Sequence, residues 1–445
     1  MNPGLIVKLR PAGPWRIGSG SGARNRVDAI YHSDSLYSAV CWAMARAGML
    51  DEWLDATARA AEPAVSFSSC FPFVEDVLCI VPPRTIWPPA TGGISARLRW
   101  KSARFAPLDV VRALLAGSKL DEALWSLDGA SECLTPAGKP GPFRDAVRWS
   151  AAVDRLTGAT ERHSTACLEF RAGCGLWCVV SFLDSAARDL WRKPVEAAFR
   201  LLADSGFGGE RSRGWGRAEA PEFVEGDLPD LILPPRPAAT GLMDDEAVLD
   251  RLVADLVGGT LEEPAPPASV EPSQEPAQES APDVSLPENG ALPANGVNGI
   301  KAEGELAAEA PREMGGGVAV LEEEEVAVAI AEEVQPPEPQ PELALQVSEG
   351  DAPHLHWLLS LYTPAAADSV DWQRGAYAVL TRGGRVESPA GSGELKKQLP
   401  MIAEGSVLSA SQEPRGAATD VGPEGFPHPV YRAGFAVSIP LPEVR

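Results

Sequence analysis

The first 235 residues alternate between short apolar runs of the kind that form strands and longer segments with helical spacing. Residues 5–9, 65–73, 76–81 and 176–183 are rich in apolar, β-branched or aromatic side chains, which predicts strands. A further strand is expected at residues 218–224.

Helices are expected between these strands. Ser33 or Asp34 can cap a first helix, in which apolar side chains recur at helical spacing over residues 36–43. A second helix is predicted to begin near Pro194, because proline suits the first turn, and to end at Gly206, which suits the C-terminal cap. Two shorter helices are predicted at residues 109–115 and 121–127.

The last part of the chain has a period of two. Residues 355–361 and 435–439 alternate apolar and polar side chains, and residues 377–386 predict a hairpin that turns at Gly383 and Gly384. The whole pattern predicts an α+β protein with two RRM-like (ferredoxin-like) domains, in which helices cover one face of each antiparallel sheet.

Composition separates these two parts. Residues 241–350 contain 25 Asp or Glu, three Lys or Arg and no aromatic residue, whereas the rest of the chain has a net charge of only −1 out of the total of −23. A segment without aromatics buries too little apolar surface to offset its conformational entropy. We therefore expect an N-terminal domain at 1–235, a disordered acidic insertion at 236–352 and a C-terminal domain at 353–445.

A glycine-rich run with arginines carries the strongest functional signal. Its glycines allow close backbone approach to a ligand, and its arginines supply charge for phosphates. The run follows a predicted helix and leads into a predicted strand, which argues against a nucleotide loop of the P-loop or Rossmann type. The alternative is a connection needed only for chain reversal. The predicted RNA-binding residues are Gly206, Gly208, Gly209, Arg211, Ser212, Arg213, Gly214, Gly216 and Arg217.

This run resembles the glycine-rich loop of the RAMP superfamily of CRISPR proteins. The sequence GFGGERSRGWGR is similar to one branch, the fourth Csm subunit of type III-A effector complexes, a relative of the Cas-five group. Further stretches that resemble this family lie at residues 32–36, 69–73, 153–158, 401–406 and 428–434.

The resemblance implies a non-catalytic scaffold. Such subunits hold the repeat-derived 5′ tag of the guide RNA, bind the large polymerase-like Csm subunit and contact the backbone RAMP subunit. The target RNA is reached indirectly, because base pairing with the guide reads its sequence. No cofactor and no metal are expected.

Other basic or polar positions complete the predicted RNA-binding set. In the context of this family we expect RNA contacts from a loop after the first strand, from the start of the first helix, from a polar turn and from a lysine pair. For each position alone, a solvated side chain is the alternative. These residues are Arg16, Gly18, Ser19, His32, Ser33, Arg155, Lys396 and Lys397.

Residues 77–108 contain five bases and no acid, with aromatics interleaved. This composition suits single strands and splayed bases. The segment is a candidate for the thumb-like hairpin that the resemblance implies, and the alternative is a hairpin that packs on a neighbouring subunit. Its candidate residues are Arg97, Arg99, Trp100, Lys101 and Arg104.

Other functions remain open alternatives. An endoribonuclease that processes guide RNA would need His32 as its general acid or base. The equivalent subunit of a type III-B complex, or a generic RNA-binding protein with an acidic interaction tail, would also fit parts of the pattern. The seven scattered cysteines, without a CxxC pair, indicate reduced thiols in a cytoplasmic protein. Neither a signal peptide nor a membrane span is expected.

Overall fold

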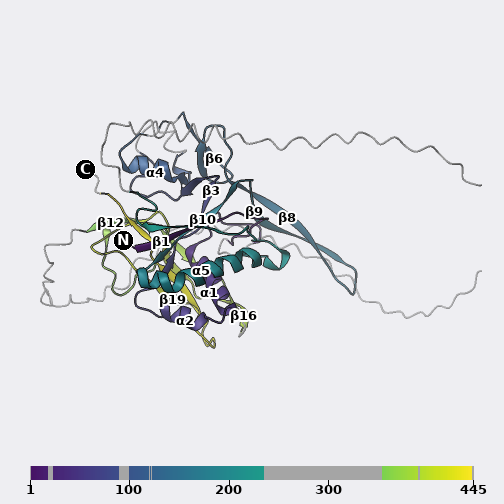
Figure 1. Ribbon diagram of the computed structural model, residues 1–445. Coiled ribbons are helices and arrows are strands. Elements are labelled where there is room, and N and C mark those ends of the chain that lie inside the picture. Colours follow the sequence, from purple (N-terminus) through teal and green to yellow (C-terminus); the bar gives the residue numbers. More distant parts are fainter. Residues whose placement is uncertain are drawn as a thin grey trace, which may run out of the picture. The chain divides into compact units, whose positions relative to one another are not determined.

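The computed structural model describes residues 2–18, 24–89, 100–119, 121, 123–234, 353–388 and 391–442, which all belong to one compact unit. The predicted disordered insertion at 236–352 lies outside the described residues. The architecture is mixed α+β with antiparallel sheets, as predicted (Figure 1).

A seven-stranded antiparallel sheet forms the centre of the N-terminal part, in the order β11-β1-β10-β3-β4-β5 with β2 also on β10. Strand β1 is buried along most of its length because β10 and β11 pair with it on either side. The strands are β1 (Asn2–Leu9), β2 (Val65–Phe67), β3 (Phe71–Val74), β4 (Val77–Ile80), β5 (Ala106–Pro107), β10 (Cys174–Phe182) and β11 (Glu222–Leu228).

Helices α1 (Ser33–Arg46) and α5 (Ser185–Ser205) pack on each other, and α5 contacts β1 and β10 (Figure 1). The helix α5 begins nine residues before the predicted start, because Asp184 accepts a hydrogen bond from the Ala187 N–H at 2.7 Å and Pro194 lies inside the helix. Gly206 ends it, as predicted.

Two short helices accompany this layer. They are α2 (Leu50–Ala56) and α4 (Leu108–Leu115), and the latter confirms the helix predicted at 109–115. The helix predicted at 121–127 is wrong, because β6 (Trp125–Asp128) pairs there with β7 (Cys133–Pro136).

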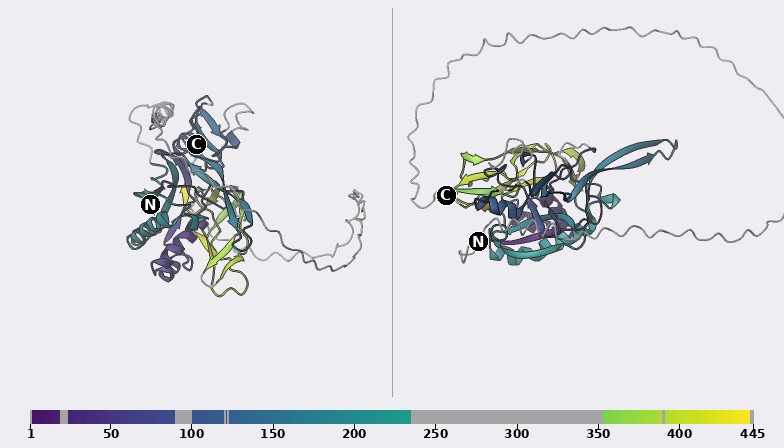
Figure 2. Two further views of the ribbon diagram at one scale, coloured as in Figure 1. Left: turned by 90° about the vertical axis from the view of Figure 1, so that its right-hand side faces the viewer. Right: turned by 90° about the horizontal axis from the view of Figure 1, so that it is seen from above.

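A long two-stranded hairpin projects from the N-terminal part. It consists of β8 (Phe143–Val153) and β9 (Thr160–Phe170), paired along their full length. Figure 1 and the right-hand view of Figure 2 show it extending away from β10. Most of its residues from Arg144 to Glu161 are exposed, so the hairpin has no partner along its outer half within the described residues.

The C-terminal part consists of strands, and its described residues contain no helix. An RRM-like arrangement of helices is therefore not present there, and α1 supplies helical packing on β20 instead. The strands are β12 (His354–Leu358), β13 (Val370–Ala376), β14 (Val379–Arg382), β15 (Arg385–Ser388), β16 (Gly391–Leu395), β17 (Leu399–Ile402), β18 (Val407–Ala410), β19 (Gly416–Asp420), β20 (Tyr431–Phe435) and β21 (Ser438–Pro440).

The hairpin predicted at 377–386 is also corrected. Strand β14 pairs with β17 and β15 pairs with β16, so the two segments do not pair with each other across Gly383 and Gly384. The largest sheet of this part has the order β13-β18-β12-β21.

Both parts share one hydrophobic core. Trp357 on β12 is fully buried and donates from Nε1 to the Val81 carbonyl at 3.2 Å. Phe435 on β20 packs edge-on against Tyr37 of α1, with ring centroids 5.4 Å apart. Apolar burial of this kind is the main stabilising contribution to folding, and here it fixes α1 against the C-terminal strands.

Candidate nucleic-acid interface

The glycine-rich loop is shaped by close backbone contacts. Gly206 leaves α5 with φ +98°, and Phe207 turns inward to stack on Trp15 with ring centroids 5.1 Å apart. The Phe207 N–H donates to the Gly216 carbonyl at 2.9 Å. A Cβ atom on Gly216 would lie 1.9 Å from the Phe207 oxygen. These glycines therefore serve the local fold first.

The predicted loop around Arg16 lies directly beside the glycine-rich loop. The Gly209 N–H donates to the Arg16 carbonyl at 2.9 Å, and a Cβ atom on Gly208 would approach the same oxygen to 2.4 Å. Gly18 is exposed, and Ser19 lies outside the described residues. The structure thus brings Arg16, Gly208 and Gly209 together on one surface.

The three arginines of the loop have different surroundings. The guanidinium of Arg211 lies 5.2 Å from the ring centroid of Trp42 and pairs with Glu387 at 3.1 Å. Arg213 pairs with Glu210 at 3.1 Å, and Arg217 donates to a carbonyl oxygen of the preceding helix. Of the three, Arg211 lines the adjoining hollows. Ser212 and Gly214 are exposed beside it.

A groove runs along α1 between the glycine-rich loop and the C-terminal strands. The hollow along α1 has a volume of about 410 Å³. The hollow at the glycine-rich loop shares Trp42 and Arg211 with it, and a third hollow of about 220 Å³ shares Lys396, Arg385 and Tyr431 with it. The three hollows are therefore one continuous depression, which we call the α1 groove.

Cations and aromatic rings line the α1 groove, together with the carboxylate of Glu387. Trp42 comes from α1, Arg211 from the loop, and Arg385, Lys396 and Tyr431 from the C-terminal part. Such a combination suits the backbone and bases of a single strand. Arg211 and Lys396 were predicted from the sequence. The other three were not, although Tyr431 lies in a segment that carried the family resemblance.

The two predicted lysines are separated. Lys396 is half-buried and lines the groove, whereas Lys397 is exposed and does not belong to its lining. The pKa of Lys396 is lowered by burial and by the nearby Arg432.

Beneath the groove, Asp34 joins α1 to two arginines of the C-terminal part. Arg382 donates to Asp34 from Nε at 3.1 Å and from Nη2 at 3.0 Å, and Arg432 donates to the same carboxylate. All three side chains are buried. Although burial opposes ionisation, Arg382 and Arg432 hold the pKa of Asp34 well below its usual range.

The prediction that His32 contacts RNA is corrected. Its side chain is 1% exposed, with Nδ1 2.7 Å from Glu404 Oε1 and Nε2 3.1 Å from Asp28 Oδ2. Burial opposes protonation, but the carboxylates of Glu404 and Asp28 raise the pKa of His32 to about 9. The imidazolium therefore holds the N-terminal and C-terminal parts together.

Ser33 is likewise buried and does not face a ligand. Its N–H donates to the Ser69 hydroxyl at 2.9 Å, and its own hydroxyl accepts from the Leu361 N–H at 3.0 Å. The sequence placed Ser33 correctly in the first turn of the helix, but the prediction that Ser33 or Asp34 caps it is wrong, because His32 is the N-cap residue and makes no side-chain cap. The burial of that helix end against the C-terminal part could not be recognised from local pattern.

The candidate thumb at 77–108 is also corrected in its aromatic residues. Trp100 is buried and packs edge-on against Trp87, and Phe105 is fully buried. Arg104 pairs with Asp28 at 2.9 Å, and Lys101 is exposed. Arg97 and Arg99 lie outside the described residues. The buried rings cannot stack on bases in this arrangement.

The hairpin that does project is β8–β9, and Arg155 lies in the exposed turn at its tip. The sequence predicted Arg155 in a polar turn between apolar runs, and this placement is confirmed. The side chains of Trp149 and Leu156 are 72% and 96% exposed. Large apolar side chains that are exposed in this way are typical of interaction surfaces.

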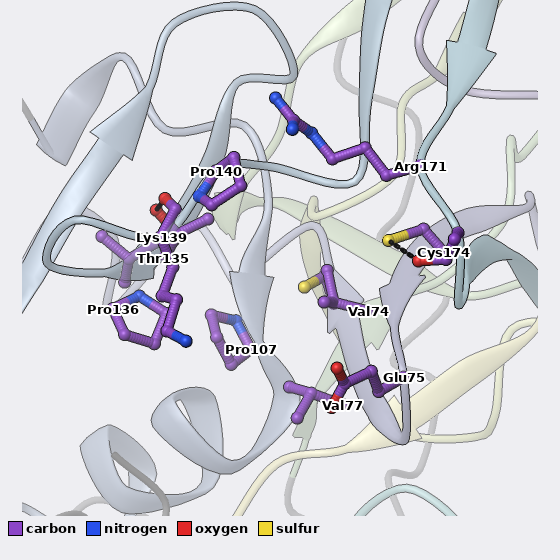
Figure 3. A pocket seen from close by; sticks show the side chains of 13 residues that line it. Val74, Glu75, Val77, Pro107, Thr135, Pro136, Lys139, Pro140, Arg171 and Cys174 are labelled. Carbon is purple, nitrogen blue, oxygen red and sulfur yellow. Dashed lines mark hydrogen bonds between the residues drawn. The ribbon is translucent and has the colours of Figure 1, made fainter. Parts of the chain in front are cut away.

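Another hollow lies away from the α1 groove. It is lined mainly by apolar side chains, among them Val74, Val77 and Pro107 (Figure 3). Its volume of about 70 Å³ is small against the roughly 300 Å³ at which ligand pockets begin. Among the described residues, no cluster of three or more His, Cys, Asp or Glu side chains could hold a metal ion.

Comparisons with known proteins give one family match. Residues 352–441 match the family described as CRISPR Csm4 C-terminal domain. A crystal structure of a Csm1–Csm4 cassette in complex with cA4 is similar at 13% sequence identity, covering 100% of this chain and 99% of that chain with a TM-score of 0.46. A crystal structure of a Csm3–Csm4 subcomplex in the type III-A CRISPR–Cas interference complex is similar at 12% identity, covering 99% and 100% with a TM-score of 0.49. No curated protein sequence matches the chain.

Within the part of the chain that the structure describes, no helix is long and apolar enough to cross a membrane.

Proposed function

We propose, on the premise that residues 352–441 of this chain form a CRISPR Csm4 C-terminal domain, that the protein is a non-catalytic scaffold subunit of a type III-A Csm complex. In this proposal it binds the repeat-derived 5′ tag of the guide RNA and joins the large polymerase-like subunit to the backbone subunits. The observation that carries the proposal is the α1 groove, which is lined by Arg211, Arg385, Lys396 and several aromatic rings, Trp42 and Tyr431 among them.

The chemistry of the groove supports RNA as its occupant. Guanidinium and ammonium groups pair with phosphates, and aromatic faces accept unstacked bases. Arg211 already lies over the face of Trp42, so a base can stack in line with the guanidinium plane. The acidity of the chain does not oppose this, since the net charge outside residues 241–350 is −1.

The topology of the N-terminal sheet supports an RRM-like RAMP domain. Strand β1 is followed by α1, and β10 is followed by α5 and then β11. Strand β1 lies between β10 and β11, so two β-α-β units interleave in one antiparallel sheet. The glycine-rich loop follows α5, where the resemblance to the RAMP superfamily requires it.

The environment of His32 favours a scaffold over a guide-processing nuclease. A general acid or base must reach the proton that it transfers. His32 is buried, and both ring nitrogens are engaged by carboxylates. An endoribonuclease that uses this histidine would have to break two ion pairs before reaching a phosphate.

The β8–β9 hairpin is our candidate for the thumb-like element of the family. Its exposed Trp149 and Leu156 suit insertion against bases or against a neighbouring subunit. Arg155 between them can contact a phosphate at the same place.

The test is affinity purification of the tagged protein from cells that carry its CRISPR system, with sequencing of bound RNA and identification of bound proteins. The proposal expects short RNAs with a common repeat-derived 5′ end, together with a large polymerase-like subunit and a backbone subunit. Arg211→Ala should reduce RNA recovery, whereas Arg188→Ala on the outer face of α5 should not. Recovery of random RNA, or of no RNA, would overturn the proposal.

A further inference from the structure

One end of the α1 groove concentrates positive charge to an unusual degree. The hollow of about 220 Å³ between α1 and the C-terminal strands is lined by Arg382, Arg385, Lys396 and Arg432. The carboxylate of Asp34 is the one acidic group in its described lining. Four cations therefore face one anion, and the lining has a net charge of +3.

Some N–H donors of these arginines have no acceptor among the described residues. Asp34 and Ser35 occupy Nε and Nη2 of Arg382, and within the described residues no protein group bonds to its Nη1. Nε of Arg432 is buried without a partner in the same part of the chain. Leaving a buried donor without an acceptor is unfavourable, and more so when the group is charged.

The ammonium group of Lys396 also lacks an acceptor. Within the described part of the chain, no hydrogen bond or ion pair reaches its ammonium group, although the side chain is half-buried. Its pKa is lowered first by burial and then by Arg432, whose own pKa is lowered first by burial and then by Arg382. Like charges held together in a half-buried place are unfavourable unless an anion joins them.

The lining also offers neutral donors at a suitable place. The hydroxyls of Ser35, Ser38 and Tyr431 belong to the hollow, and the first turn of α1 faces it with Asp34 and Ser35. The volume is several times the roughly 30 Å³ of one water molecule, so an anion with its hydration fits. Tyr431 also lines the wide part of the α1 groove, so the hollow opens directly into the proposed RNA path.

We infer that this hollow is a dedicated phosphate pocket, which binds one phosphate group of the RNA in the α1 groove through Lys396, Arg385 and the free edge of Arg382. The inference rests on the proposed function and deepens it, since it assigns one anchoring point on the C-terminal part. The buried Asp34 orients the two arginines from below, so the pocket keeps its shape before RNA arrives. The phosphate group is either a linkage inside the chain or a terminal monoester.

The experiment uses the full-length protein and a synthetic, fluorescently labelled single-stranded RNA with the 5′ sequence recovered in the purification. Fluorescence polarisation is measured over a series of salt concentrations for the wild type, Lys396→Ala, Arg385→Ala and the control Lys193→Ala. Lys193 is exposed on α5 and does not line the groove. Losing one charge-assisted contact should weaken binding about tenfold. It should also reduce the slope of log K against log salt by about 0.7.

A second arm locates the phosphate. Each linkage of the RNA is replaced in turn by an uncharged methylphosphonate, and the 5′ end is tested with and without a phosphate. One position should weaken wild-type binding and have no further effect in Lys396→Ala, which is the signature of a direct pair in a double-mutant cycle. If the sensitive phosphate is internal, the pocket binds a linkage of the RNA chain. If it is the 5′ phosphate, the pocket binds a terminal monoester. Either result supports the pocket.

The outcomes separate this inference from the proposed function. If the wild type does not bind the RNA, the proposed function fails. If Arg211→Ala weakens binding while Lys396→Ala and Arg385→Ala behave like Lys193→Ala, the groove stands and the phosphate pocket is overturned. A thermal melt of each variant confirms that it is folded. Lys396→Gln keeps more of the side chain than Lys396→Ala, and it repeats the test with a smaller cavity.

Discussion

Asp34 in the first turn of α1 accepts two hydrogen bonds from Arg382, a residue 348 positions further along the chain. The bidentate contact buries a carboxylate and a guanidinium between the N-terminal and C-terminal parts. Arg432 approaches the same carboxylate, so one acid balances part of the charge of two arginines. This arrangement fixes α1 against β14 and β20 and shapes one end of the α1 groove.

Removing that carboxylate should destabilise the fold strongly. Asp34→Asn leaves Arg382 and Arg432 buried without a counter-charge, and breaking a buried pair from one side costs about 3–5 kcal/mol. Urea unfolding should show this loss in the free energy of unfolding. The control Asp55→Asn breaks an exposed pair with Arg59 and should change stability by less than about 1 kcal/mol. Equal effects of the two substitutions would contradict the assigned role of Asp34.

The ion pairs of His32 should make stability depend on pH. The pKa of His32 is raised to about 9 by Glu404 and Asp28, against about 6.5 in the unfolded chain. A raised pKa stabilises the folded state fully below pH 6.5, and this contribution declines as the pH rises to about 9. The difference in the free energy of unfolding amounts to about 3.5 kcal/mol at most, since one pKa unit corresponds to about 1.4 kcal/mol.

The measurement is urea unfolding between pH 6 and pH 10 for the wild type and His32→Gln. The wild type should lose stability across this window relative to the variant, because glutamine does not titrate. If the free energies of unfolding of the two proteins changed in parallel with pH, the ion pairs of His32 with Glu404 and Asp28 would not contribute to stability.

The glycines of the loop should not be equivalent. Gly216 has φ +79°, and a Cβ atom there would lie 1.9 Å from the Phe207 oxygen. Gly214 has the same φ of +79° but open space around the added atom. Gly214→Ala should therefore cost only the backbone strain of about 1 kcal/mol, whereas Gly216→Ala should cost clearly more because the chain must shift.

Urea unfolding of the two alanine variants measures this difference directly, because backbone φ is matched. RNA affinity provides a second measurement. Gly216→Ala should weaken it more than Gly214→Ala, since displacement of Phe207 would move the Arg16 loop and Arg211. Similar stabilities for the two variants would mean that the loop adapts to a side chain at Gly216 without strain.

The sequence predicted the elements whose signals are local. The strand at β1, the start of α1 and the end of α5 at Gly206 follow from apolar runs, a polar helix start and a glycine cap. The beginning of α5 was missed because only Trp191 is buried among residues 185–193, so Pro194 was taken for the start of the helix. Local pattern has no means of telling an internal proline from an initial one when the preceding face is solvated.

The α1 groove was predicted in part for a different reason. Arg211 and Lys396 stand in stretches that are glycine-rich or basic in the sequence itself. Arg382 and Arg432 acquire their role only through Asp34, and a contact across the whole chain leaves no signal in local periodicity. His32 shows the converse, since a histidine at a helix start was expected to face a ligand but is covered by Glu404 from the C-terminal part.

The exposed outer half of the β8–β9 hairpin should matter for assembly and not for folding. Trp149 is 72% exposed, so replacing it with serine removes almost no buried apolar surface, and stability should change by less than about 0.5 kcal/mol. If the hairpin inserts into the assembled complex, Trp149→Ser should weaken recovery of the backbone subunit or the target RNA in affinity purification. The control Leu190→Ser changes a 67% exposed residue on α5, away from the hairpin, and should leave recovery unchanged. Equal recovery with all three proteins would show that the exposed tryptophan has no partner in the assembly.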